Sequence, residues 1–112
     1  MVLTAYGKYA KIWQMEVRID DDSLSRMETD AGYSAGYDPA IVKAFRKVMQ
    51  FIRNSNNQHD FNTMRSLRFE KLKGKRSQQY SMRLTKQWRL IIELEKSGKS
   101  QLVAVKGIED YH

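Results

Sequence analysis

Two short stretches of alternating apolar and polar residues constrain the fold of this chain more than any other feature. Residues 79–84 and 88–94 both show the alternation of a strand that is buried on one face. Directly paired residues of an antiparallel hairpin point to the same face, so a shared core requires even-numbered residues to pair with even-numbered ones. A loop of odd length around residues 85–87 satisfies this requirement and pairs Met82 with Leu90.

The same register places two arginines on the face away from the core. Arg83 is expected to lie opposite or diagonal to Arg89, although like charges that face each other destabilise a sheet. Guanidinium groups match the geometry of phosphate oxygens, so an anion between the two side chains would explain the pair. The alternative is that both side chains extend into water, with Glu93 between them.

The most clearly signalled helix spans residues 38–52. Asp38 is a favourable N-cap, and Pro39 occupies the first helical position, where a missing N–H costs nothing. The apolar residues recur at helical spacing and predict a buried stripe, with a solvated basic side formed by other positions. The stripe consists of Ile41, Val42, Phe45, Val48, Met49 and Ile52, and the basic side of Lys43, Arg46, Lys47 and Arg53.

Weaker patterns complete the predicted order of elements. Residues 12–19 have strand character, and a short helix capped by Asp22 or Ser23 is expected to follow. Segments 31–37 and 54–60 are predicted as loops.

Further strands are expected at 67–72 and 102–108, with turns at 73–76 and 96–99. The resulting fold class is α+β: an N-terminal strand, one or two helices, and a three- to four-stranded antiparallel sheet. At 112 residues, we expect residues 1–112 to form a single domain.

Composition excludes several functional classes. The chain has no cysteine and two histidines, His59 and His112, so we expect no disulfide, no metal centre and no cofactor. No stretch approaches the roughly 18 apolar residues of a membrane helix, and no signal peptide is apparent. These features predict a cytoplasmic protein that does not associate with membranes.

The positive charge is concentrated in one stretch. The net charge is +7, and residues 65–89 hold nine Lys or Arg side chains against one acidic side chain. Such a block is typical of a surface that binds a polyanion, most often nucleic acid. A solubilising surface is the other interpretation.

Residues 109–112, with the sequence EDYH, directly follow a predicted strand. Terminal residues are usually frayed, but here a histidine, which can transfer protons near neutral pH, accompanies a tyrosine and a carboxylate.

Four blocks together resemble the HigB branch of the RelE/ParE toxin superfamily. They match the patterns L-K-G, Y/W-S-I-R, x-W-R-I and D-Y-H, in order and with compatible spacing. Together they lie within residues 38–112, whereas residues 1–37 match only in offering a first strand. The blocks are Leu72-Lys73-Gly74, Tyr80-Ser81-Met82-Arg83-Leu84, Gln87-Trp88-Arg89-Leu90 and Asp110-Tyr111-His112.

The resemblance implies a RelE-like, microbial-RNase-like domain that acts as the toxin of a type II toxin–antitoxin system. It implies a ribosome-dependent endoribonuclease that cuts mRNA in the ribosomal A site without a metal, through attack by the ribose 2′-OH. The implied partners are mRNA, ribosomal RNA and a HigA-like helix-turn-helix antitoxin.

The resemblance also implies roles for individual residues. Arg83 and Arg89 would hold the scissile phosphate, with Lys73 as a further phosphate contact. His112 would transfer a proton, Tyr111 would contact the nucleotide, and Asp110 would orient its neighbours. Three further basic residues read as docking charges for ribosomal RNA: Lys71, Lys75 and Arg76.

Two departures from the family pattern leave questions open. Some relatives carry a histidine shortly before L-K-G, where this chain has Glu70 and Lys71. Which residues transfer protons in this chain therefore stays open. The segment 20–37 is longer and more acidic than in the family, and could either shield the basic site or shape antitoxin binding.

Two other functions compete with the endoribonuclease. A non-enzymatic toxin of the same fold, similar to the ParE gyrase inhibitors, would stop growth without cutting RNA. An inactive RNA-binding module ranks last, because the sequence lacks a stacking platform of several exposed aromatic residues.

Overall fold

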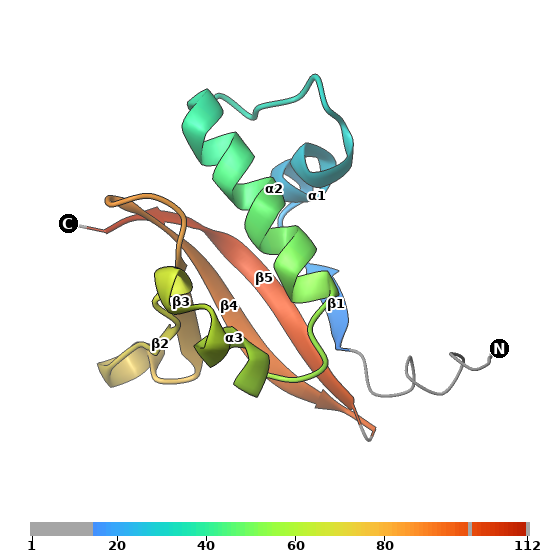
Figure 1. The fold of residues 1–112 in the computed structure, drawn as a ribbon, viewed down its shortest axis with the longest axis vertical. Coiled ribbons are helices and arrows are strands. Elements are labelled where there is room, and N and C mark those ends of the chain that lie inside the picture. The colour runs from blue at the N-terminus through green and yellow to red at the C-terminus, as the bar shows by residue number, and fades with distance from the viewer. Residues whose placement is uncertain (1–14, 99, 112) are drawn as a thin grey trace, which may run out of the picture.

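A computed structural model describes residues 15–98 and 100–111 (Figure 1). Within this part of the chain, strands, α-helices and two 3₁₀ turns follow one another as a mixed α+β fold, as the sequence predicts. The elements in order are β1 (Glu16–Ile19), α1 (Asp22–Thr29), α2 (Pro39–Arg53), α3 (His59–Thr63), η2 (Arg65–Leu67), β2 (Glu70–Lys71), η3 (Gly74–Arg76), β3 (Gln79–Arg83), β4 (Trp88–Ser97) and β5 (Ser100–Asp110).

The sheet has five strands in the order β1-β5-β4-β3-β2. The strands β2 to β5 pair antiparallel, whereas β1 pairs parallel with β5. Parallel neighbours require a crossover connection, and here α1 and α2 belong to it, lying over one face of the sheet (Figure 1). The predicted antiparallel sheet of three to four strands is therefore confirmed as β2 to β5, and the predicted N-terminal strand joins its edge in parallel.

The hairpin formed by β3 and β4 has the register that the alternation predicts. Met82 pairs with Leu90, and Arg83 pairs with Arg89. Met82 and Leu90 are fully buried beneath the helices. The two arginines consequently share the opposite face, which we call the open face.

The core lies between α2 and the face of the sheet that is turned toward the helices. All six apolar residues of the predicted stripe are buried, and all but Ile41 belong to one cluster with inward side chains of the three longest strands. Fully burying an aliphatic or aromatic side chain stabilises a fold by roughly 1.5–3 kcal/mol. The strand residues of this core are Met82, Leu90, Ile92, Val103 and Val105.

A bulge in β5 keeps its apolar residues in that core. Ile91 pairs with Gly107, but Ile92 pairs with Val105, so Lys106 is an extra residue without an opposite partner. Without this shift, Lys106 would lie opposite buried Ile92 in the core. The bulge sends Lys106 to the open face instead.

A chain of aromatic rings fastens the β2 edge of the sheet to the helices. The ring of Phe61 in α3 lies 6.3 Å from that of Phe51 in α2 and 5.2 Å from that of Phe69. Phe69 in turn stacks on Tyr80 of β3 at 5.0 Å. Phe61 is completely buried, so it joins helix and sheet at one point.

Two local predictions are wrong. Only two residues of the expected strand 67–72 are extended, because Leu67 ends η2 and Arg68 adopts the left-handed conformation (φ 45°), which breaks an extended chain. The expected loop 54–60 ends early, since α3 begins at His59.

The cap predictions also need correction. Asp21, not Asp22 or Ser23, caps α1, with its carboxylate accepting from the Leu24 N–H. Asp38 occupies the N-cap position of α2, but its side chain makes no capping hydrogen bond.

The acidic segment is largely used within the fold. Glu28 bonds Arg53 of α2, and Asp30 accepts from the Gly32 N–H and from Arg26. Arg46, expected on the solvated side of α2, is half-buried and donates to the backbone carbonyls of Met27, Asp30 and Tyr33. These contacts attach α1 and its loop to α2.

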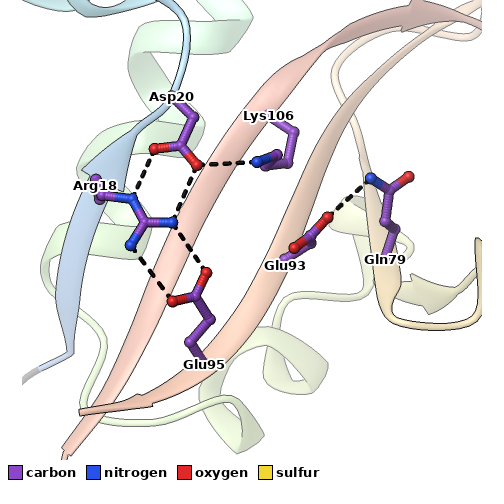
Figure 2. Close-up of polar contacts among 6 residues, drawn as sticks. All are labelled: Arg18, Asp20, Gln79, Glu93, Glu95 and Lys106. Atoms are coloured by element: carbon purple, nitrogen blue, oxygen red, sulfur yellow. Dashed lines mark hydrogen bonds and ion pairs between the residues drawn. The ribbon is translucent and has the colours of Figure 1, made fainter.

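A charged network on the open face joins β1, β4 and β5 (Figure 2). Arg18 donates to Asp20 at 2.7 and 3.0 Å and to Glu95 at 3.3 and 2.9 Å, and Lys106 adds a contact to Asp20 at 3.0 Å. The two cations and two carboxylates are balanced in charge. This end of the open face therefore offers no excess positive charge.

Replacing Phe61 with alanine should destabilise the fold by about 3–5 kcal/mol, because the change leaves a cavity where helices and sheet meet. Urea unfolding followed by circular dichroism measures the free energy of unfolding. Asn62→Ala, on the exposed side of the same helix, is the matched control and should change it little. An equal loss in both variants would contradict the role given to Phe61.

The Asp20 network predicts a loss of stability in acid. Hydrogen bonds from Arg18 and Lys106 hold the pKa of Asp20 well below its ordinary value. A lowered folded-state pKa stabilises the fold above the unfolded-state pKa of about 3.9, and that contribution disappears as the pH falls through the folded-state value. Urea titrations between pH 7 and pH 2 should therefore show a steeper loss for the wild type than for Asp20→Asn. Parallel curves would show that the network does not act on stability.

Candidate functional site

Side chains of four strands form two adjacent rows on the open face. Paired residues share a face, so Glu70, Ser81 and Ile91 form one row and Arg83, Arg89 and Glu109 form the next. Ser81 is fully buried, and its hydroxyl has no hydrogen-bond partner among the described residues.

Arg89 lies at the centre of the second row and is the most unusual residue of this face. Its relative exposure is 9%, yet its Nε–H is buried without a partner in the described chain. One terminal nitrogen makes a long contact of 3.4 Å with the carbonyl of Arg68. Burying a guanidinium is costly unless an anion or hydrogen-bond acceptor pairs with it, so Arg89 is a natural position for binding an anionic group.

The carboxylate opposite Arg89 is already engaged. Glu109 pairs with Arg89 in the sheet register, but both of its oxygens accept from Arg76, at 2.9 and 2.7 Å. Arg76 belongs to η3, which precedes β3 in the chain. To reach Glu109 in β5, its side chain spans β3 and β4 on the open face. Arg76, expected as a docking charge, is thus held in an ion pair, which raises its pKa.

Tyr111 covers the guanidinium of Arg89. The Tyr111 ring lies 4.6 Å from the Arg89 carbon Cζ, and the tyrosine is 43% exposed. Its backbone N–H donates to the carbonyl of Gln87, whose side chain donates to Asp110 at 2.9 Å. The structure thus brings Tyr111 to the arginine pair. Asp110 instead pairs with Trp88, on the other face of the sheet, and His112 lies outside the described residues.

Three lysines of the basic block lie outside the two rows. Lys71 pairs with Tyr80, a core-side residue, so it lies on the side of the sheet away from Arg89. Lys73 and Lys75 are exposed on either side of Gly74, which bends the chain with a φ of 69°. The structure does not bring these three lysines together at the arginine pair.

Glu70 is a candidate that sequence reasoning did not assign. Its pairing with Ser81 puts it on the open face, diagonal to Arg83, and it is exposed. Its signal in the sequence was its place two residues before Leu72, where some relatives carry a histidine. It is the acidic residue that the basic block 65–89 contains.

Two searches of the described residues bear on the class of site. No cluster of three or more His, Cys, Asp or Glu side chains there could hold a metal ion. None of the described helices combines the length and apolar character needed to cross a bilayer.

Comparison with known proteins identifies the family. A family model described as the RelE-like toxin HigB of type II toxin–antitoxin systems matches residues 17–112. The match includes strands β2 to β5, all of β1 except Glu16, and the arginine pair. A search of curated proteins finds no match.

Two solved structures are similar to this chain. A YoeB/ParE toxin from Agrobacterium tumefaciens is similar with a TM-score of 0.52 and 18% identity, covering 88% of this chain and 100% of that one. A YoeB dimer from Staphylococcus aureus has a TM-score of 0.47 and 16% identity, covering 88% and 98%. The first likeness supports the fold alone, and the family follows from the sequence match.

The chain therefore belongs to the HigB family of RelE-like toxins, the toxin components of type II systems in which each toxin is paired with an antitoxin.

Proposed function

We propose that this toxin is an endoribonuclease that cuts mRNA in the ribosomal A site and thereby inhibits translation. The observation that carries the proposal is Arg89, a buried guanidinium beside a second arginine, Arg83; among the residues that the structure describes, its Nε–H has no partner. A phosphate between the two would complete the hydrogen bonding of Arg89 and remove the repulsion across the strands.

The proposed reaction needs only the RNA's own nucleophile. The ribose 2′-oxygen bonds to the adjacent phosphorus while the bond from phosphorus to the 5′-oxygen breaks. The proton of the 2′-OH passes to a base on the protein, and the leaving 5′-oxygen receives a proton. The products are a 2′,3′-cyclic phosphate and a 5′-hydroxyl end.

Arg83 and Arg89 would stabilise the charge that develops on the phosphate oxygens. Fixed positive groups are most effective in a site that excludes water, and Arg89 is already shielded by the Tyr111 ring. Tyr111 would stack on a base at this position, and Asp110 would hold the segment through Gln87. Lys73 would add a phosphate contact from the exposed turn before η3.

Two groups are candidates for proton transfer. Glu70 lies on the open face diagonal to Arg83, and its carboxylate could accept the proton of the 2′-OH. His112 follows Tyr111 directly in the sequence and could donate to the leaving oxygen. In this proposal Glu70 is the general base and His112 is the general acid.

The remaining partners follow from family and charge. A HigA-like helix-turn-helix antitoxin would silence the toxin, and ribosomal RNA would attract the exposed lysines, Lys71 and Lys75, without regard to sequence. Arg76 would contribute less to docking, since Glu109 already holds it. The proposed site of action is the cytoplasm, on translating ribosomes.

Replacing Arg89 with lysine should lower cleavage of mRNA on translating ribosomes by about 10²–10³-fold, although the charge is kept. An ammonium group cannot reproduce the guanidinium fork at a buried site. Primer extension on a reporter mRNA measures the rate, and Arg83→Ala should show a comparable loss. Lys43→Ala removes an exposed cation from the helical side and should cut normally.

Unchanged cutting in both arginine variants would reject the site. Intact mRNA together with inhibition of DNA supercoiling by gyrase would instead establish the ParE-like alternative. Salt-sensitive RNA binding without any product would establish an inactive binding module.

Replacing Glu70 with glutamine tests the proposed base. Cleavage should fall by roughly 10²–10⁴-fold, and the acidic limb of the pH–rate profile should disappear, because an amide cannot accept the proton. A chain lacking His112 should lose the basic limb instead. A Glu70→Gln variant that cuts at the wild-type rate with an unchanged profile would remove Glu70 from the mechanism.

A further inference from the structure

A pocket of about 390 Å³ opens beside Arg83. It is separate from the site proposed to bind the phosphate between Arg83 and Arg89. It lies between the second half of α2, the turn η2 and the tip of the β3–β4 hairpin. At the hairpin tip, β3 extends beyond the short edge strand β2. There the edge of β3 is bordered by η2 instead of by β2. Arg83 belongs to both places, being paired with Arg89 on β4 and lining this pocket.

The lining combines three kinds of side chain. Phe51, Met64 and Leu84 provide half-buried apolar surface of the kind on which a flat ring can rest. Ser66 and Thr85 add hydroxyl groups that can both donate and accept hydrogen bonds.

The charge of the lining is of one sign. Lys47, exposed on α2, and Arg83 are the charged members, and no acidic residue is among the lining residues. A ligand that combines a flat apolar body, polar edges and a neighbouring negative charge would match all three features.

We propose that this pocket holds one nucleobase of the RNA, next to the phosphate bound by Arg83 and Arg89. This inference rests on the proposed function and adds the part of the substrate that would be read. A volume of about 390 Å³ lies at the lower end of ligand pockets, which suits a single base with part of its sugar. Bases that leave their stack are recognised by stacking on flat side chains and by hydrogen bonds along their edges.

The shared residue Arg83 favours a base over a peptide. A base and its phosphate are joined by a single ribose, so a pocket that shares the residue Arg83 with the proposed phosphate site lies at the right order of distance. An acidic segment of the antitoxin would also match Lys47 and Arg83, but it would gain nothing from the position of the arginine pair. The hydroxyls of Ser66 and Thr85 supply the polar groups needed to distinguish bases.

The test fills the pocket without touching the arginines. Ala44, half-buried on the α2 wall, is replaced with leucine, and Ser66→Leu fills the opposite wall as a second variant in case the first does not fold. Ala40→Leu, the same change at an exposed position of the same helix outside the pocket, is the matched control.

Binding is measured first, because it does not depend on cleavage. The four nucleoside 3′-monophosphates and ribose 5-phosphate, which lacks a base, are titrated into the full-length protein and followed by NMR shifts of pocket residues. We expect at least one nucleotide to bind tenfold or more tightly than ribose 5-phosphate. Filling the pocket should abolish that difference, and Ala40→Leu should preserve it.

The outcomes separate this inference from the proposed function. Equal binding of ribose 5-phosphate and all four nucleotides would overturn the base pocket, even if the protein cuts mRNA. Base-dependent binding that the filled variants lose would support the pocket, even if no mRNA is cut on ribosomes and the proposed function fails. Filled variants that bind nucleotides normally but lose affinity for the antitoxin would reassign the pocket to that partner.

Discussion

The pairing of Met82 with Leu90 is the contact on which the rest of the molecule depends. It places two fully buried side chains under the helices and thereby decides which face of every neighbouring strand is the core. A slip of one residue would move Arg83 into the core and Met82 into water. The cost of burying that charge makes the register unambiguous, and it forces Arg83 and Arg89 together on the open face.

The open face then divides into two electrostatic regions. At one end, Arg18 and Lys106 are neutralised by Asp20 and Glu95 (Figure 2). At the other end, Arg76 occupies the carboxylate of Glu109 that would otherwise pair with an arginine of the second row. The acidic side chains thus stabilise the scaffold. Among the described residues none forms an ion pair with the guanidinium of Arg89, which agrees with the proposal that it binds an external phosphate.

Much of this arrangement can be predicted from the sequence. The alternation of apolar and polar residues alone shows which residues of a strand share a face of the sheet. The order of elements, the stripe of α2 and the hairpin register all follow from local patterns that tertiary packing did not override. The bulge is also encoded in the sequence, since the spacing of apolar residues changes from two to three between Val105 and Ile108. The parallel pairing of β1 and the shortness of β2 were not readable, because they depend on where helices cross the sheet and on the left-handed turn at Arg68.

The candidate site shows the same division between local and long-range information. The sequence predicts that Arg83 and Arg89 meet, but the face of Lys71 and Glu70 depends on how β2 pairs, which no local pattern fixes. A basic block read as one surface therefore separates into two, with Glu70 on the side of the arginines. Because β3 ends where η2 replaces β2, Arg83 both pairs with Arg89 and borders the pocket beside α2. Under the proposed function, the early end of β2 would let one arginine contact two parts of a nucleotide, which a longer edge strand would separate.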